Sequence, residues 1–343
     1  MIKIGIIGCG GIANNKHMPA LAKVEAVEMV AFCDIIEERA SKAREEFGTD
    51  AANVYTDYEE LLKNETVDLV SVCLPNALHA PVSIAALESG AHVLCEKPMA
   101  TTQAEAEAMI EASEKRGKTL MIAHNQRFVR SHQKAKELIA EGAIGKVYSF
   151  RTTFGHGGPE GWSVDGENSW FFRKDDAVIG AMGDLGVHKA DLIRYILGEE
   201  FTEVSAMVET NAKENISVDD NAVCLLKSTS GVIGTLTASW AYKVNESNAT
   251  VIYGEKGVLR LEDDPNYSLI ATYTDGSKVN YELGKIQTNE EGQQTSTGVV
   301  SHFVESVRTN TKPLIDGVEG KKSLGIILAA MESSQTGRTI KLN

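Results

Sequence analysis

The chain has 343 residues, a length sufficient for about two domains with separate hydrophobic cores. Its formal net charge of −14 argues against a nucleic-acid partner, which needs clustered Lys and Arg. No apolar stretch approaches the roughly 18 residues that span a membrane, the first strand leaves no room for a cleavable leader, and the five cysteines show no metal-ligand spacing. We therefore expect a cytoplasmic protein with no nucleic-acid, membrane or metal partner.

The first predicted elements form a nucleotide-binding βαβ unit. A mostly apolar strand, Ile2 to Ile7, enters the turn Gly8-Cys9-Gly10-Gly11-Ile12-Ala13, which a helix follows. Gly8 permits the tight turn, Gly10 lets the backbone approach a pyrophosphate, and Ala13 lets helix and strand pack closely. The amides at the helix N-terminus then face the anion. The sequence therefore predicts a dinucleotide site that includes Gly8, Gly10, Gly11 and Ile12.

An acidic residue at the end of the second strand indicates which dinucleotide binds. Asp34 follows the run Met29 to Cys33 and lies twenty-one residues beyond Ala13. Its carboxylate can accept hydrogen bonds from the adenosine ribose and would repel a 2′-phosphate. Ile35 and Ile36 offer no cation for such a phosphate. NAD is therefore expected over NADP. A glycine turn alone can be purely structural, but the strand, the helix and the acid together favour the cofactor.

Strands and helices continue to alternate as far as residue 123, which predicts a parallel sheet covered on both faces. The predicted helices are Glu37 to Phe47, Tyr58 to Leu62, Pro81 to Ser89 and Thr102 to Arg116, and the predicted strands are Leu69 to Leu74, His92 to Cys95 and Leu120 to Ala123. We therefore assign residues 1–123 to a Rossmann domain.

The pattern changes after residue 123 to longer runs that alternate apolar and polar residues, as half-buried antiparallel strands do. The predicted strands are Val147 to Phe154, Glu203 to Thr210, Asn221 to Lys227 and Val232 to Trp240, and the predicted helices are Ser131 to Glu141, Gly186 to Leu197, Ser301 to Arg308 and Val318 to Ser334. Residues 124–343 are assigned to an α+β domain with one large open sheet and helices on one face. The polar stretch Asn289 to Ser296 is interpreted as a surface loop.

Ligands of open α/β sheets bind outside the carboxyl ends of the strands. In the first domain three turns follow such ends: Gly8 to Ala13, Pro75 to His79, and Glu96 to Pro98. Lys97 in the third turn is either a solvated surface cation or, in a crevice, a group that binds a substrate oxygen or passes on a proton.

The second candidate cluster is Gly183 to Asp191, in which Asp184 and His188 are four residues apart and can share a helix face. An Asp there can simply cap the helix, and a helical His can be structural. The sharper hypothesis is that Asp184 contacts the same substrate from which His188 removes a hydroxyl proton, since a His pKa of about 6.5 suits that step.

The motifs together resemble the glucose-fructose oxidoreductase, inositol dehydrogenase and rhizopine-catabolism (Gfo/Idh/MocA) family over essentially the whole chain. They are GCGGIA at 8–13, LPNALH at 74–79, GAHVLCEKP at 90–98, HNQRF at 124–128, GKVYSFR at 145–151 and GDLGVHKAD at 183–191. The resemblance implies a nicotinamide cofactor, oxidation of sugar or polyol hydroxyls, and a second-domain sheet that forms dimer or tetramer contacts.

The resemblance also implies roles for individual residues. Lys97, Asp184 and His188 match the family's catalytic residues, and the Lys97-Pro98 bond is expected to be cis. Positions that approach the cofactor are Pro75, Asn76, His79, Glu96, Lys97 and Asn125, and positions that face the substrate are Lys97, Arg127, His156, Trp170, Asp184 and His188. For either Trp of the 156–173 region, buried packing is the alternative to sugar binding. Val178 to Gly183 keeps only part of the glycine run of relatives, which leaves the pocket's shape open.

We expect a cytoplasmic NAD-dependent dehydrogenase that interconverts a secondary hydroxyl and a ketone on a sugar, inositol or related polyol, as a homodimer or homotetramer. Two alternatives stay open. An NAD-dependent glycosidase that works by transient oxidation and elimination would use the same three side chains. A ligand-sensing regulator on this fold would need none of them.

Overall fold

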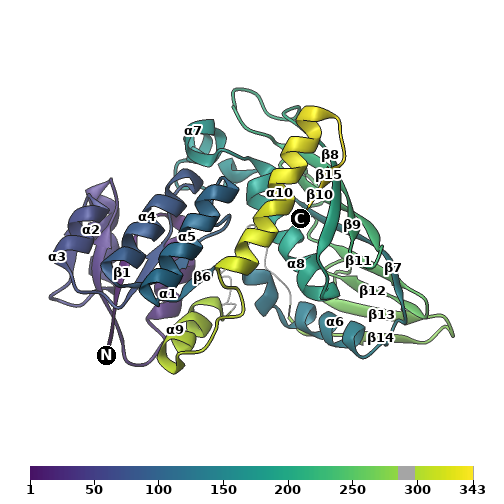
Figure 1. Ribbon diagram of the computed structural model, residues 1–343, viewed down its shortest axis with the longest axis horizontal. Coiled ribbons are helices and arrows are strands. Elements are labelled where there is room, and N and C mark those ends of the chain that lie inside the picture. Colours follow the sequence, from purple (N-terminus) through teal and green to yellow (C-terminus); the bar gives the residue numbers. More distant parts are fainter. Residues whose placement is uncertain (285–297, 343) are drawn as a thin grey trace. The chain divides into compact units, whose positions relative to one another are not determined.

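The computed structural model describes residues 1–284 and 298–342, and the described chain divides into two compact units (Figure 1). The first contains residues 1–124 and 298–322, and the second contains residues 125–284 and 323–342. Each unit is built on one large sheet. The loop predicted over Asn289 to Ser296 lies outside the described residues.

A six-stranded parallel sheet in the order β3-β2-β1-β4-β5-β6 forms the first unit. Its strands are β1 (Ile2–Ile7), β2 (Val27–Cys33), β3 (Asn53–Tyr55), β4 (Leu69–Val72), β5 (His92–Cys95) and β6 (Leu120–Ile122). This is the doubly wound order, in which the connections reverse direction between β1 and β4. The carboxyl ends of β1 and β4 therefore flank the switch point where such sheets bind ligands. The predicted Rossmann fold is confirmed.

Helices follow most strands of the first unit. They are a π-helical turn (Ala13–His17), α1 (Met18–Leu21), α2 (Glu37–Phe47), α3 (Tyr58–Asn64), α4 (Asn76–Ser89), α5 (Gln103–Arg116), α9 (Val299–Thr309) and the start of α10 (Gly317–Thr336). Helix α5 begins as a capping box, because Thr102 Oγ1 accepts the amide of Glu105 and the Glu105 carboxylate accepts the amide of Thr102.

Helix α4 begins at Asn76, five residues before the predicted start at Pro81, which instead lies inside the helix. A proline predicts a helix start because its missing amide is harmless in the first turn. Here Pro81 lies in the second turn and removes a single helical hydrogen bond. The strand β3 was not predicted at all, because a three-residue strand carries no readable period.

The chain returns to the first unit after the second unit's sheet. Asp316 forms an isolated antiparallel bridge with Met121 on β6, and the amide of Ile122 donates to the carbonyl of Ile315 at 3.0 Å. A side chain at Gly320 would meet Ile122 at 2.6 Å, so the start of α10 packs closely on the same strand. Residues 298–322 thus belong to the first unit, whereas the sequence-based division at residue 123 placed them in the second. Chain order alone carries no signal for such a return.

The second unit contains a nine-stranded sheet in the order β14-β13-β12-β11-β7-β10-β9-β8-β15. Its strands are β7 (Val147–Gly155), β8 (Phe201–Glu209), β9 (Asn221–Ser228), β10 (Ile233–Ser239), β11 (Thr250–Gly254), β12 (Gly257–Leu261), β13 (Leu269–Tyr273), β14 (Lys278–Tyr281) and β15 (Ile340–Lys341). Only β7 and β10 pair in parallel, so the sheet is mixed and mostly antiparallel, as predicted. The four strands from β11 to β14 were not predicted, because strands of four or five residues are too short to show a clear period.

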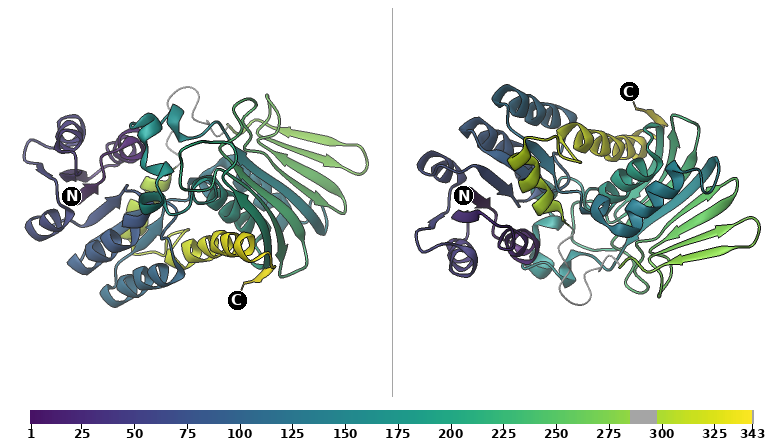
Figure 2. Two further views of the ribbon diagram at one scale, coloured as in Figure 1. Left: turned by 90° about the horizontal axis from the view of Figure 1, so that it is seen from above. Right: turned by 90° about the horizontal axis from the view of Figure 1, so that it is seen from below.

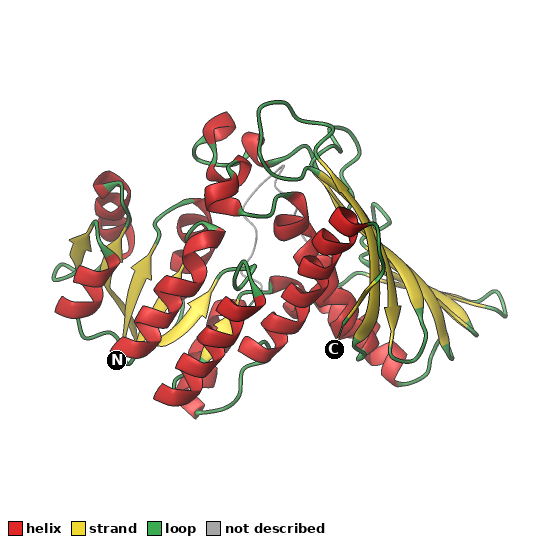
Figure 3. Ribbon diagram, turned by 45° about the horizontal axis from the view of Figure 1, so that its top comes forward, coloured by secondary structure: helices red, strands yellow, loops and turns green. Residues whose placement is uncertain are grey.

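Helices of the second unit cover one face of this sheet (Figures 2 and 3). Helices α6 (Arg130–Ala140) and α8 (Val187–Leu197) and the rest of α10 lie on this face (Figure 1). The unit also contains α7 (Lys174–Ala177), a π-helical segment (Met182–Gly186) and 3₁₀ turns at Asn125–Phe128, Pro159–Gly161, Gly166–Asn168 and Trp170–Phe172. Strand β9 alternates strictly between buried residues, such as Cys224 and Leu226, and exposed ones, such as Val223 and Leu225. The buried face and α8 form the core, and the other face of β9 is open.

The glycine turn supplies a stability prediction. Gly8 has a φ of 91°, and a Cβ there would lie 2.2 Å from the carbonyl oxygen of Cys73. Gly8→Ala should therefore lower the free energy of unfolding by roughly 2 kcal/mol or more, measured by urea denaturation. Gly10→Ala is the matched control, since a Cβ at Gly10 meets no atom within 4 Å. Equal unfolding midpoints for the two variants would contradict this account.

Candidate active site

The carboxylate of Asp34 lies against the glycine turn of the first unit. Asp34 Oδ2 accepts the amide of Cys9 at 2.9 Å, and Oδ1 accepts the amide of Ile36 at 2.9 Å. Gly10 faces open space where a side chain would stand, which suits a backbone approached by a pyrophosphate. Gly11 is half-buried and Ile12 is exposed. The turn thus fits a dinucleotide with its phosphates at the glycines and its ribose at Asp34.

Asn14 shapes this turn, although its sequence position did not single it out. Its side-chain Nδ2 donates to the carbonyl of Cys9 at 2.6 Å and to that of Gly10 at 2.9 Å. Both carbonyls are thereby satisfied on the helix side of the turn. The following segment is π-helical rather than α-helical, a local geometry that often marks functional sites.

A buried hydrogen-bond chain connects this helix with the Glu96-Lys97-Pro98 turn. His17 Nδ1 lies 2.8 Å from Ser71 Oγ, and His17 Nε2 lies 2.8 Å from Glu96 Oε1. Burial alone would lower the pKa of His17, but contacts with Cys73 and Glu96 outweigh it and raise that pKa to about 10. Burial alone would raise the pKa of Glu96, but the His17 hydrogen bond and the nearby positive charges lower it. The pair is therefore ionic at neutral pH.

Glu96 also contacts the backbone of Lys97, the residue that the resemblance implies is catalytic. Its Oε2 accepts the backbone amide of Lys97 at 3.1 Å, and the Lys97-Pro98 peptide bond is cis, as the resemblance implied. Lys97 itself is half-buried. His17 was missed by sequence reasoning because the residue that gives it a role, Glu96, is seventy-nine positions away.

His79 connects two of the three predicted turns. Its Nδ1 lies 2.6 Å from the carbonyl oxygen of Pro98, and its Nε2 lies 2.8 Å from that of Leu74. Burial lowers the pKa of His79, so the ring is neutral and donates to one carbonyl at a time. Pro75 precedes α4, and Asn76 is its first residue, buried at 4% exposure. These contacts give His79 a structural role, and its cofactor contact stays a prediction.

In the second unit, Asp184 lies in the π-helical segment directly before α8. It is 6% exposed, and its Oδ2 accepts the indole Nε1–H of Trp240 at 3.2 Å. His188, 9% exposed, lies in the first turn of α8, with its ring 5.9 Å from that of Phe154. Asp184 and His188 are thus a carboxylate and an imidazole buried at the same helix start.

The approach to Asp184 is strained. Val178 has a φ of 64° and a ψ of −47°, and the amide of Ile179 donates to the carbonyl of Ala177 at 2.7 Å, which is a tight γ-turn. A β-branched residue rarely adopts this conformation. The incomplete glycine run noted in the sequence therefore has a structural consequence, because glycine would take this turn without strain.

Phe154, which contacts His188, belongs to a cluster of aromatic side chains. His156 lies edge-on to Phe154 at 5.9 Å and to Trp162 at 6.3 Å, and its Nδ1 accepts the amide of Gly158. Trp170 is half-buried and stacks on Phe171 with ring centroids 3.9 Å apart. His156 is only 2% exposed, whereas Trp162 is 37% exposed. Of these rings, Trp162 is the most exposed, and the substrate contact of Trp170 stays a prediction.

The loop that carries His156 is tied to a second loop. Lys213 Nζ donates to the carbonyl of Gly157 at 2.7 Å and forms an ion pair with Glu160. The backbone amide of Lys213 donates in turn to Asp220 at 2.7 Å. This anchoring was not predicted, because neither Lys213 nor Asp220 belongs to a motif.

Two residues of the HNQRF motif begin the second unit. Arg127 is 4% exposed and forms a two-pronged pair with Asp191, with Nε to Oδ2 at 2.8 Å and Nη2 to Oδ1 at 2.7 Å. These contacts account for Arg127 structurally, and its substrate contact stays a prediction. Asn125 is half-buried at the start of the 3₁₀ turn. Within residues 1–284 and 298–342, no group of His, Cys, Asp and Glu could hold a metal ion.

Lys189, next to His188, is fully buried. Its Nζ donates to the carbonyl of Asn248 at 2.8 Å and lies 3.5 Å from Thr250 Oγ1. Burial lowers the pKa of Lys189 to about 7, against a smaller opposing effect of Glu262. This helix start therefore carries an amine that loses its proton near neutral pH.

The Lys189 amine predicts a pH dependence of stability. Between pH 7 and pH 10 the unfolded chain keeps the Lys189 proton while the folded chain releases it, so stability rises with pH by at most about 1.4 kcal/mol per unit. Urea unfolding of the wild type and of Lys189→Met at pH 7, 8 and 9 measures this. The variant should lack that part of the rise, and identical slopes would show that Lys189 is charged in the folded protein.

Comparisons with known proteins agree with this architecture. Residues 2–124 match the model of an oxidoreductase family with an NAD-binding Rossmann fold, and residues 132–260 match the GFO/IDH/MocA C-terminal domain. The myo-inositol 2-dehydrogenase of Thermotoga maritima is 28% identical over 344 residues, covering 99% of this chain and 98% of that protein.

Levoglucosan dehydrogenase of Pseudarthrobacter phenanthrenivorans is 30% identical over 287 residues, covering 75% of this chain and 72% of that protein. A solved structure of levoglucosan dehydrogenase in complex with NADH and levoglucosan superposes with a TM-score of 0.83 at 25% identity, covering 99% of each chain. The family models match the part of the chain that forms the six-stranded Rossmann sheet and most of the part that forms the nine-stranded mixed sheet. This chain therefore belongs to the Gfo/Idh/MocA family of NAD-binding oxidoreductases.

Proposed function

We propose that the protein is an NAD-dependent dehydrogenase that interconverts a secondary hydroxyl and a ketone on a sugar, inositol or related polyol. The observation that carries the proposal is the buried Asp184 and His188 at one helix start, beside aromatic rings, in a chain with an NAD-binding fold. The names of the relatives, among them myo-inositol 2-dehydrogenase and levoglucosan dehydrogenase, support this substrate class.

The proposed roles follow from the chemistry of each side chain. His188 accepts the hydroxyl proton as the alcohol is oxidised, and returns it in the reverse direction. Asp184 orients the substrate through hydrogen bonds, and the ammonium of Lys97 stabilises the negative charge that develops on the substrate oxygen. NAD, when bound, supplies the hydride chemistry, and the protein supplies placement and charge.

We infer that Asp34 selects NAD over NADP. Its carboxylate is already fixed by two backbone amides, and the next residues, Ile35 and Ile36, are exposed and carry no charge. A 2′-phosphate would therefore meet a negative charge with no compensating cation. Gly8, Gly10, Gly11 and Ile12 would hold the pyrophosphate, and the turns that carry Pro75, Asn76, His79, Glu96 and Lys97 would line the remainder of the cofactor site.

The experiment is a screen of sugars, inositols and sugar acids with NAD and with NADP, followed by nicotinamide absorbance. We expect reduction of NAD by at least one polyol. In His188→Ala the turnover should fall by about 10² to 10⁴, while the Kd for NADH stays unchanged. His302→Ala, in α9 of the first unit, is the matched control and should keep wild-type turnover.

Other outcomes of the screen identify the alternatives. Release of an aglycone without net NADH would indicate a glycosidase that oxidises its substrate transiently. Binding of NAD without turnover on any substrate would indicate a ligand-sensing regulator. Activity with NADP alone would show that Asp34 does not select the cofactor.

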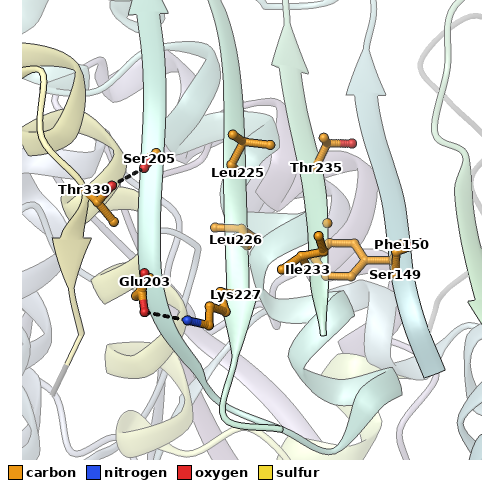
Figure 4. A pocket seen from close by; sticks show the side chains of 11 residues that line it. Ser149, Phe150, Glu203, Ser205, Leu225, Leu226, Lys227, Ile233, Thr235 and Thr339 are labelled. Carbon is orange, nitrogen blue, oxygen red and sulfur yellow. Dashed lines mark hydrogen bonds and ion pairs between the residues drawn. The ribbon is translucent and has the colours of Figure 1, made fainter. Parts of the chain in front are cut away.

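We also propose that a second copy of the chain covers the open face of the nine-stranded sheet. Figure 4 shows this face over β7, β8, β9 and β10, where Leu225 and Ile233 lie to one side of the polar pairs Glu203–Lys227 and Ser205–Thr339. Met207, Val223, Leu225 and Ile233 are each at least half exposed there. Apolar side chains gathered on one face indicate an interface, and a self-complementary contact gives a dimer.

Leu225→Glu should disrupt this assembly, because it places two carboxylates in an apolar contact. We expect a dimer or tetramer for the wild type and a smaller species for the variant in light scattering coupled to gel filtration. Val244→Glu is the control, since Val244 is 78% exposed, against 61% for Leu225, but lies outside the strands of the sheet. A monomeric wild type would refute the proposal.

The cellular setting is inferred from composition. All five cysteines are buried and unpaired, which fits a reducing compartment, and we propose the cytoplasm. The net charge of −14 gives no reason to expect a nucleic-acid partner. Among the helices that the structure describes, none is long and apolar enough to cross a membrane.

A further inference from the structure

Trp240 places its one polar side-chain atom against Asp184. The residue lies immediately after β10, is fully buried, and donates its indole Nε1–H to Asp184 Oδ2 at 3.2 Å. An indole can only donate, so the contact has one possible polarity and is made to a carboxylate oxygen. A donor fixed in this way determines the direction in which the carboxylate points.

The indole ring has little freedom to move. Phe171 and Phe172 meet it edge-on, with ring centroids at 6.4 Å and 5.8 Å. The backbone amide of Trp240 donates to the carbonyl of Asp220 at 2.7 Å. Packing against two aromatic rings and a backbone hydrogen bond therefore hold the donor in place.

The segment that leads to the acceptor, Asp184, is hydrogen-bonded to Asp219, the residue next to Asp220. The carboxylate of Asp219 accepts the amides of Gly180 and Met182 at 2.7 Å and 2.8 Å, and the amide of Ala181 donates to the carbonyl of Asp219 at 2.9 Å. These bonds fix the segment that enters the π-helical turn of Asp184. A side chain at Gly180 would lie 1.9 Å from the Asp219 carbonyl oxygen, so the approach is close.

Two adjacent residues, Asp219 and Asp220, therefore hold the segments that carry the two partners of the Trp240–Asp184 hydrogen bond. Asp220 anchors the backbone of Trp240, and Asp219 anchors the segment before Asp184. The two positions lie immediately before β9, a strand whose pairing with both neighbours is regular from Asn221 to Lys227. The sheet therefore fixes the geometry of the hydrogen bond between Trp240 and Asp184.

We propose that Trp240 is a positioning residue that holds the Asp184 carboxylate in the orientation needed to bind substrate. The inference rests on the proposed function, in which Asp184 contacts the substrate. Catalytic groups must be held within a fraction of an ångström of the productive geometry, and a buried, rigid donor reduces the freedom of the carboxylate before substrate arrives.

Trp240→Phe is the informative variant, because it keeps an aromatic ring and removes the N–H. We expect kcat/KM to fall by about tenfold to a hundredfold, with an unchanged Kd for NADH. Phe150→Leu is the control. It reduces side-chain volume at another fully buried position of the same core, and it should lower stability without lowering kcat/KM. Wild-type kcat/KM in Trp240→Phe overturns the proposal.

A double-mutant cycle tests whether Trp240 acts through Asp184. If it does, Trp240→Phe should lower kcat/KM little further in an Asp184→Asn background, because the carboxylate that it orients is already gone. Equal losses in both backgrounds would mean that Trp240 acts by another route and would overturn the proposal.

Indole N–H resonances give a test that needs neither activity nor a Trp240 variant. The chain contains three tryptophans, at positions 162, 170 and 240. In tryptophan-labelled protein, Asp184→Asn should shift the Trp240 indole resonance more than the other two. An unshifted Trp240 resonance refutes the contact even if the protein is an active dehydrogenase. A shifted resonance in a protein without turnover refutes the proposed function and, with it, the positioning role.

Discussion

The second unit depends on a helix whose ionisable side chains are buried in the core. Helix α8 is buried at every position from Val187 to Arg194, and that run includes His188, Lys189 and Asp191. An ionised group in an apolar environment is unfavourable unless hydrogen bonds or opposite charges compensate it. Asp191 receives both prongs of the Arg127 guanidinium and the hydroxyl of Ser323, and Lys189 donates to a backbone carbonyl. Each partner comes from a different element, so the polar contacts of the helix fix its position together with its apolar residues.

Hydrogen bonds to buried or half-buried carboxylates also fix the irregular segments near the candidate site residues. Backbone amides donate to Asp34 in the first unit, and to Asp219 and Asp220 in the second. A carboxylate can satisfy two or three amides at once, which irregular backbone cannot do for itself. Rigid sheets therefore carry loops whose shape is set by a few acidic side chains. Such loops can differ between relatives while the sheets stay constant.

Sequence reasoning was strongest where a period extends over several residues. The amphipathic strands β7 to β10 and the helices α5, α8 and α10 were found within a few residues of their observed bounds. It failed at Pro81, where a local proline rule gave the wrong helix start, and at β11 to β14, which are strands of only four or five residues. Trp240 was read only as the end of a strand, because its partner Asp184 is fifty-six residues away. No local signal distinguishes a buried donor from a buried packing residue.

The sequence by itself determined the Rossmann fold, the nicotinamide cofactor and the family, because these depend on residues close together in the chain: a glycine turn, an acid at a fixed distance, and regular alternation of strands and helices. Tertiary structure alone decided that residues 298–322 return to the first unit, that Arg127 pairs with Asp191, and that Asp219 and Asp220 brace Trp240 and the segment before Asp184. Such pairings join residues tens of positions apart. They depend on which surfaces the folded chain brings into contact, and a one-dimensional pattern does not record that.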